Sequence, residues 1–308
     1  MSAKRPSLAI LTHSTDDFWQ VGYLVQLMIP RWEAMGFQVV VVTEVDPFVP
    51  ADIALLHVDL SIVPEATRRL AERYPVVLNG RVLDIRKRQF SQLLVERQEP
   101  YIGSVIVKTD WNYGGWREFR RGIVESPIGP LLRKFGMAEL VCHRLQRLEA
   151  RRSWRRKRML NSDDYRVYAE THLVPSGVWH NPNLIVERFL AERDGSDYCC
   201  RHWLFFGRQE VHKRTLSPRP VVKIGAARED RLSSIERIAD PIPKELRTIR
   251  ERMGFDYGKF DYGIVDGKVL LYDVNRTPGA SADPRNHTET IDVLSEGLRA
   301  ALDQDGGR

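Results

Sequence analysis

The sequence has few cysteines and no long apolar run. Its 308 residues include three cysteines, which are Cys142 and the adjacent pair Cys199 and Cys200. Three thiols in a chain of this length do not make a disulfide framework, and adjacent cysteines lack the usual spacing of metal ligands. We expect buried thiols and a cytoplasmic location. No stretch approaches the roughly 20 apolar residues of a membrane span, and we expect no signal peptide, because residues 1–6 are polar and the apolar run after them is short.

Two common functional patterns are also missing. No Gly-x-Gly-x-x-Gly follows the first apolar run, at residues 7–12, so the sequence disfavours dinucleotide binding. No convincing Ser/His/Asp or Cys/His arrangement is present, so it does not favour a nucleophilic hydrolase. His13 follows the first run, and we expect a local hydrogen-bonding role for it. Basic residues are in excess: 47 Lys and Arg face 41 Asp and Glu, giving a net charge of +6, which fits an anionic ligand without indicating nucleic acid.

Residues 258–279, GKFDYGIVDGKVLLYDVNRTPG, have the pattern of a β-hairpin. Asp266-Gly267 supplies turn chemistry between two short apolar runs. Asp261 lies in the first run, whereas Asp273 and Asn275 end the second and point to one face. Two carboxylates and an amide oxygen suit a hard cation, Mg²⁺ first. The alternative is an exposed hairpin with ordinary surface acids.

The register of this hairpin decides whether its carboxylates can share a metal ion. A two-residue turn at Asp266-Gly267 would pair Asp261 with Tyr272, which places Asp261 and Asp273 on opposite faces of the sheet. A shared ion therefore requires an odd loop, such as residues 266–268, or a β-bulge.

These residues carry a family resemblance. Asp261, Asp273-Val274-Asn275 and Pro278-Gly279 resemble the metal-binding signature of the ATP-grasp family, in which Asp, Glu or Asp, and Asn hold two Mg²⁺ ions on the phosphates of ATP. Many members have Glu where this chain has Asp273, and the shorter carboxylate can still ligate a metal. The resemblance implies ATP and two Mg²⁺ ions, or Mn²⁺ in their place, with Asp261, Asp273 and Asn275 as the metal ligands.

The predicted elements agree with an α/β (α+β) class and, by the resemblance, with an ATP-grasp fold. Strand-like and helical runs alternate over residues 7–79, which predicts a small parallel sheet. The resemblance makes this sheet a pre-ATP-grasp domain. The implied domains are 1–82 for the pre-ATP-grasp α/β domain, 83–182 for the small lobe with a basic helical insertion at about 117–160, and 183–308 for the large lobe with the metal site. Further helices are expected at 16–35, 64–74, 81–96, 137–160, 241–253 and 288–302, and further strands at 101–108, 183–190, 198–206 and 209–215.

The resemblance also implies residues that bind the nucleotide. Two lysines, one in the helical pattern at 81–96 and one that ends the strand at 101–108, are similar to the two ATP-grasp lysines. The glycine pair after that strand corresponds to a phosphate-covering loop, and the run NLIVERFL at 183–190 resembles the hinge that binds adenine, with Asp194 or Asp197 near the ribose. The implied residues are Lys87, Lys108, Gly114, Gly115, Glu187, Arg188, Phe189, Leu190, Asp194 and Lys213.

Three basic residues are implied for catalysis. Lys259 lies two residues before Asp261 and on its face, where the dipeptide-ligase branch has an Arg that steadies the acyl phosphate; a Lys would act there as a point charge. Arg201 resembles an arginine that contacts substrate or phosphate in related ligases, and Arg276 lies in the rigid loop after the last metal ligand. Arg201, like Lys213 and Arg214 on the same predicted sheet, can equally be a surface charge.

The segment from Trp116 to His180 is long and contains a basic run at 144–158. Apolar residues at helical spacing in 137–160 predict a helix. One interpretation of the charges is a solvated helix face. The other is capture of a polyanion, such as an acidic peptide, a phosphorylated substrate, an RNA or an anionic membrane surface. Few aromatic residues interleave with the charges, which disfavours single-stranded nucleic acid.

Together the motifs and the resemblance imply an ATP-dependent carboxylate–amine ligase. ATP would phosphorylate a carboxylate of a small molecule or peptide, and an amine would attack the acyl phosphate to give an amide, ADP and phosphate. An ATP-grasp kinase that phosphorylates a hydroxyl of a polyanionic acceptor is one alternative, and a non-catalytic nucleotide-binding protein is another. A homodimer would be ordinary for the family.

Overall fold

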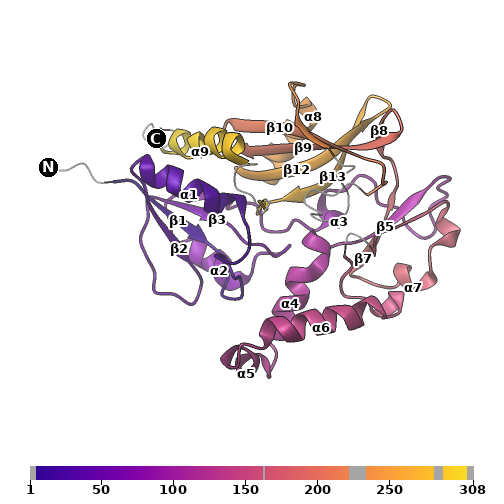
Figure 1. Ribbon diagram of the computed structural model, residues 1–308, viewed down its shortest axis with the longest axis horizontal. Helices are drawn as coiled ribbons and strands as arrows, with labels where there is room; N and C mark the ends of the chain where they lie inside the picture. Colours follow the sequence, from indigo (N-terminus) through magenta and orange to yellow (C-terminus); the bar gives the residue numbers. More distant parts are fainter. Residues whose placement is uncertain (1–4, 162–163, 222–233, 281–286, 304–308) are drawn as a thin grey trace.

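Three β-sheets and the helices beside them form an elongated molecule (Figure 1). The computed structural model describes residues 5–161, 164–221, 234–280 and 287–303. The predicted α/β class is confirmed. The three cysteines are buried, as expected. Within the described residues, no helix has the length and apolar character needed to cross a membrane.

The first sheet is parallel, with strand order β2-β1-β3-β4, as the alternating pattern predicts. The helix expected at 16–35 begins only at Leu24, because Thr12 and Tyr23 donate hydrogen bonds to the Asp16 carboxylate and residues 13–22 form turns. Gly36, with φ +96°, follows the end of this helix. The elements are β1 (Ser7–Leu11), α1 (Leu24–Ala34), β2 (Gln38–Val42), β3 (Ile53–Leu56), α2 (Glu65–Ala71) and β4 (Val77–Leu78).

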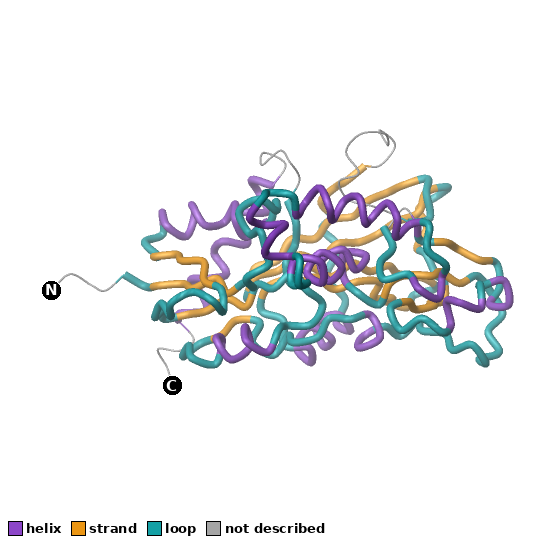
Figure 2. The backbone as a smooth tube through the Cα atoms, turned by 90° about the horizontal axis from the view of Figure 1, so that it is seen from below, coloured by secondary structure: helices purple, strands orange, loops and turns teal. Residues whose placement is uncertain are grey.

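The second sheet is antiparallel, with order β6-β5-β7, and lies at the opposite end of the molecule from the first (Figures 1 and 2). Helices α4, α5 and α6 project from the body below it (Figure 1). The elements are α3 (Lys87–Phe90), β5 (Val105–Thr109), η1 (Asn112–Gly115), α4 (Trp116–Val124), α5 (Gly129–Lys134), α6 (Ala138–Ala150), η2 (Trp154–Arg156), β6 (Arg166–Tyr168), η4 (Thr171–Leu173), α7 (Ser176–Trp179) and β7 (Leu184–Arg188).

Two helix predictions in this region are wrong in extent. Of the helix expected at 81–96 only α3 forms, because the Val95 N–H donates to Val186 O and the chain there runs beside β7. The helix expected at 137–160 ends at Ala150, and the Glu149 carboxylate then accepts the backbone N–H of Arg158. Because β7 pairs with β5, this sheet also crosses the implied lobe boundary at 182/183. The division into lobes stays a prediction.

The third sheet is the largest, with order β11-β10-β9-β12-β13 and β8 paired to β9. One face packs on α8 through a core that includes Trp203, Phe205 and Phe260. On the other face, Leu204 and Phe206 join the core around α1 and α9. Polar residues lie on this same face further along the strands. The elements are β8 (Glu192–Asp194), β9 (Asp197–Phe206), β10 (Gln209–Ser217), β11 (Ser234–Arg237), α8 (Lys244–Met253), β12 (Tyr257–Val265), β13 (Lys268–Asn275) and α9 (Thr288–Asp303).

Candidate nucleotide and metal site

A β-bulge brings the hairpin carboxylates to one face. The turn has two residues, since Val265 pairs with Lys268 across Asp266-Gly267. The register then shifts by one residue at Tyr272, so that Asp261 pairs with Asp273. Residues directly opposite each other in an antiparallel pair share a face, so the bulge supplies what a shared metal ion requires.

Four polar side chains therefore line one face of β12 and β13. Lys259 pairs with Asn275 in the register, next to the pair of aspartates. Lys259 Nζ lies 2.9 Å from Asp261 Oδ2. Burial opposes the ionisation of Asp261, but Lys259 and His202 outweigh it and hold the pKa of this carboxyl well below its usual range. Asp261 is thus a carboxylate at neutral pH.

His202 is a member of this site that the sequence analysis missed. It lies opposite Asp261 on β9, and its Nδ1 is 2.6 Å from Asp261 Oδ1, while Nε2 is 2.9 Å from the Thr215 hydroxyl. Burial lowers the pKa of His202, so the ring is neutral at pH 7 and can donate from Nδ1 while Nε2 accepts from Thr215. His202 therefore orients the carboxylate. Only the strand pairing reveals this, since 59 residues separate the two.

Lys87 approaches the same face from α3. Its side chain is buried, its Nζ lies 3.3 Å from Asp273 Oδ1, and it donates to Trp111 O at 3.0 Å. Burial disfavours the charged form, but Asp273, Tyr165 and Glu187 together outweigh it, and the pKa of Lys87 is raised. A charged lysine is thus held beside the aspartates.

The donor set fits a hard divalent cation. Asp261 and Asp273 offer carboxylate oxygens, and Asn275 Oδ1, which accepts the Thr277 N–H at 2.8 Å, is oriented by that bond. Asp273 Oδ1 is buried and accepts no hydrogen bond of good geometry from the described residues. A buried carboxylate oxygen with unused capacity suits Mg²⁺ or Mn²⁺, which prefer such ligands.

The second lysine and the expected hinge lie on the small sheet. Lys108 Nζ lies 2.7 Å from Glu187 Oε2; the Glu187 side chain is buried and that of Lys108 is partly exposed. Arg188 pairs with Glu99 at 2.6 Å. The Phe189 N–H donates to Ser104 O, and Leu190 O accepts the Tyr272 hydroxyl, so these two backbone groups already have protein partners.

Other predicted residues lie elsewhere. Arg201 is on the opposite face of the large sheet, where it pairs with Glu192 and Asp240. Arg276 is fully buried and donates to the backbone carbonyls of residues 58, 60, 61 and 82. The Asp194 carboxylate pairs with Arg214 at 2.9 Å. The structure does not bring these three beside the aspartates.

The remaining predicted residues are Lys213 and the glycine pair, and they differ in where they lie. Lys213 pairs with His202 in the register and so shares the face of the aspartates, and burial lowers its pKa. Gly114 and Gly115 have φ of +66° and +79° and pack against residues 158–161, where a Cβ on Gly114 would lie 2.2 Å from Leu160 O. The glycine pair is therefore needed for this close backbone approach.

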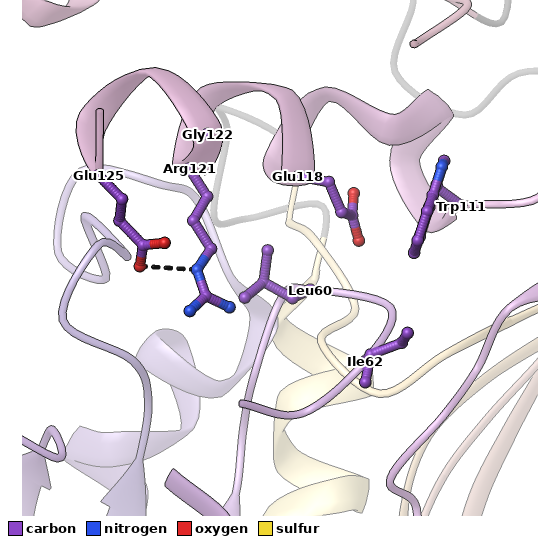
Figure 3. A pocket seen from close by; sticks show the side chains of 7 residues that line it. All are labelled: Leu60, Ile62, Trp111, Glu118, Arg121, Gly122 and Glu125. Carbon is purple, nitrogen blue, oxygen red and sulfur yellow. Dashed lines mark hydrogen bonds and ion pairs between the residues drawn. The ribbon is translucent and has the colours of Figure 1, made fainter. Parts of the chain in front are cut away.

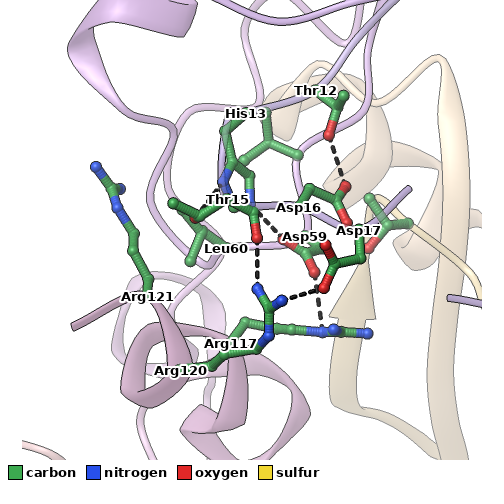
Figure 4. Close-up of polar contacts among 12 residues, drawn as sticks. Thr12, His13, Thr15, Asp16, Asp17, Asp59, Leu60, Arg117, Arg120 and Arg121 are labelled. Atoms are coloured by element: carbon green, nitrogen blue, oxygen red, sulfur yellow. Dashed lines mark hydrogen bonds and ion pairs between the residues drawn. The ribbon is translucent and has the colours of Figure 1, made fainter. Parts of the chain in front are cut away.

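A second polar cluster lies where β1 and β3 end (Figure 4). His13 Nε2 is 2.6 Å from Asp59 Oδ1, and the Thr15 hydroxyl is 2.8 Å from His13 Nδ1, so the expected hydrogen-bonding role of His13 is confirmed. Arg117 of α4 pairs with Asp59 at 2.9 Å, and Arg120 donates to Thr15 O. This cluster fastens α4 to the first sheet.

Two carboxylates and an amide lie on one sheet face with charged lysines beside them, and side chains of this kind can bind metal ions and polyanions. No family model matches the chain, and no curated protein matches it. Solved structures that are similar over nearly the full chain include a D-alanine–D-alanine ligase from Bacillus anthracis (12% identity, 98% of this chain and 100% of that chain, TM-score 0.45) and a RimK domain ATP-grasp protein from Sphaerobacter thermophilus (13%, 94% and 96%, TM-score 0.43). The macrocyclase MdnC from Microcystis aeruginosa, bound with a precursor peptide, is also similar (12%, 94% and 98%, TM-score 0.46). Because these similarities are distant, the chemistry of this chain is assigned from its own residues.

Proposed function

We propose that the protein is an ATP-dependent carboxylate–amine ligase that forms an amide or peptide bond and releases ADP and phosphate. The observation that carries this is the bulged hairpin, which gathers Lys259, Asp261, Asp273 and Asn275 on one face with Lys87 beside them. Phosphoryl transfer needs mainly positioning and charge neutralisation, which this arrangement can supply.

The proposed role of each residue follows from its charge. Asp261, Asp273 and Asn275 would hold Mg²⁺, which supplies charge neutralisation on the phosphate oxygens when bound. Lys87 and Lys108 would attract the phosphates. A carboxylate oxygen of the substrate attacks the γ-phosphorus and ADP leaves; the amine nitrogen then attacks the acyl carbon, phosphate leaves and the nitrogen loses a proton. Lys259 would stabilise the negative charge that develops on the acyl oxygen.

The first test is phosphate release from ATP and Mg²⁺ against a panel of amino acids, peptides and other carboxylates. Asp273→Asn should lower substrate-dependent release about 100-fold or more, because it removes a charged ligand from the site. Asp266→Asn is the matched control, since it makes the same chemical change in the turn of the same hairpin. ADP formation without free phosphate would instead indicate the kinase, and ATP binding without turnover across the panel would indicate a binding protein.

Further assignments extend the proposal. The substrates would be a small-molecule or peptide carboxylate and an amine. An anionic partner would bind the basic segment 144–158. A cytoplasmic location and a homodimer remain expectations from the sequence.

A further inference from the structure

A pocket outside the metal site carries an unused carboxylate. It has a volume of about 280 Å³ and lies between α4 and the segment after β3 (Figure 3). Glu118, Arg121 and Glu125 line it from α4, Leu60 and Ile62 line the other side, and the Trp111 ring closes one end (Figure 3). The pocket is thus apolar at Leu60 and Ile62, aromatic at Trp111 and charged along α4.

The charge of this lining is negative, although the chain carries a net +6. Arg121 Nε pairs with Glu125 Oε1 at 2.7 Å, which offsets one of the two carboxylates. Glu118 Oε1 accepts the Ser61 N–H at 2.7 Å, whereas Glu118 Oε2 is buried and accepts no hydrogen bond from the described residues. The buried Arg276 guanidinium offsets part of the Glu118 charge. A buried carboxylate oxygen without a hydrogen bond is still costly, and a bound cation that donates to it would reduce that cost.

The pocket adjoins the metal site through a short chain of contacts. Ser61 links the two, because its N–H donates to Glu118 and its hydroxyl accepts the Asn112 N–H at 2.7 Å. Asn112 Nδ2 in turn lies 3.5 Å from Oδ1 of Asn275. On the other side, Lys87 donates to the backbone carbonyl of Trp111, whose ring forms the pocket wall.

We propose that this pocket binds the amine substrate as a primary ammonium, with Glu118 Oε2 as its anionic partner and the Trp111 ring as an aromatic face. A cation over an indole ring is attracted by the ring's quadrupole, and Leu60 and Ile62 would contact the aliphatic part. Burial raises the pKa of Glu118, which suits a carboxylate that later takes the proton released by the amine. The inference rests on the ligase function proposed above.

The binding test does not depend on turnover. Native protein is titrated by calorimetry, without ATP, with the standard amino acids and with simple primary amines such as ethylamine and putrescine. We expect at least one of these probes to bind, and Glu118→Gln to weaken its binding about 10-fold or more, because the substitution removes the charge and keeps the shape. Glu245→Gln, an exposed glutamate of α8, is the matched control and should bind as the native protein does. Binding by none of the probes, or equal binding by Glu118→Gln, overturns the inference.

A trapping assay distinguishes an error in the proposed ligase function from an error in the proposed amine-binding pocket. Hydroxylamine is a small nucleophile that can reach an acyl phosphate without an ammonium site and converts it to a hydroxamate. We expect Glu118→Gln to form hydroxamate at the native rate while the KM for the amine rises. The assignment is contradicted if Glu118→Gln melts at the native temperature and loses hydroxamate formation and amide formation to the same extent. If native protein forms no hydroxamate with any carboxylate of the panel, the ligase proposal fails, and the titration alone still decides the pocket.

Discussion

Asp16 shows how one buried side chain can make stability depend on pH. Burial, with Asp59 nearby, raises the pKa of Asp16 to about 6. Because the folded-state pKa is raised, the protonated carboxyl is stabilising below about pH 4, and this contribution is lost as the pH rises through about 6. The other titratable and charged groups that face Asp16 are His13, Tyr23 and Arg117.

We predict that Asp16→Asn raises the melting temperature at pH 8 and leaves it nearly unchanged at pH 4. The shift sets an upper limit of about 3 kcal/mol on the gain, at about 1.4 kcal/mol per pKa unit. Thermal melts at pH 4, 6 and 8 measure it, with Asp266→Asn as an exposed control. A gain that is the same at all three pH values would show that ionisation of Asp16 is not the cause.

The sequence could predict residues whose spacing along the chain already fixes their neighbours. Asp273 and Asn275 are two apart on a strand, and their common face follows from that alone. His202 and Glu118 could not be found in this way, because their partners Asp261 and Ser61 lie 59 and 57 residues away and meet them only through tertiary packing. Arg276 had the residue type of a catalytic group, but its burial against backbone carbonyls depends on the fold.

At the scale of elements, α6 presents a mixed basic and apolar stripe to solvent. Leu140, Arg144, Arg147, Leu148 and Arg151 are exposed and recur at helical spacing, so they share one face. Elsewhere in the basic run, Arg152 and Arg158 pair with the buried Glu149 and so have a structural role. The exposed arginines of this stripe, together with the exposed Arg155 and Arg156 of η2, are therefore the cations of segment 144–158 available to the proposed anionic partner.

We predict that the triple change Arg144→Glu, Arg147→Glu and Arg151→Glu shifts elution from a heparin column to clearly lower salt. Its effect on stability should stay within about 0.5 kcal/mol per substitution, because the side chains are exposed. The control reverses three exposed cations elsewhere, Lys244, Arg252 and Lys268, and so has the same net charge. If both triple variants elute at the same salt concentration, net charge rather than this stripe governs binding.

Helices and strands were predicted correctly where a single apolar pattern runs through the whole element. The prediction failed where one segment packs against two different parts of the fold. The strands of the first sheet are continuous apolar runs, and all four lie within residues 7–79, where the alternation predicts them. Residues 81–96 have helical spacing, yet Val82, Ile85 and Phe90 pack into the core under the large sheet while Val95 hydrogen-bonds beside β7. The spacing of apolar residues along the chain cannot show that the two halves of a sixteen-residue segment pack against different parts of the fold.

At the scale of the whole molecule, α9 joins the two ends of the chain into one core. Leu294 and Leu298 are fully buried among residues of α1, the first sheet and the large sheet. Trp32 of α1 donates its indole N–H to Ser295 O at 3.0 Å. The first and third sheets therefore share a core and should unfold together.

We predict that Leu298→Ala lowers the free energy of unfolding by about 3 kcal/mol, because it leaves a cavity in this shared core. Leu148→Ala, at a leucine whose surface is 56% exposed, is the matched control and should have little effect. Urea unfolding followed by far-ultraviolet circular dichroism and by tryptophan fluorescence measures both. Separate transitions for the two probes in native protein would contradict a single shared core.

The bulge at Tyr272 also limits how this hairpin can change length. Each residue gained or lost on one strand between the paired aspartates reverses which face one of them points to. A single residue inserted into β13 between Lys268 and Leu271, with the two-residue turn and the bulge kept, would pair Asp261 with Tyr272 and send Asp261 and Asp273 to opposite sides of the sheet. A residue inserted into the turn itself can be looped out, which leaves Val265 paired with Lys268 and Asp261 paired with Asp273. The proposed metal site should therefore tolerate changes in the length of this exposed turn and be lost on an odd change in the length of one strand.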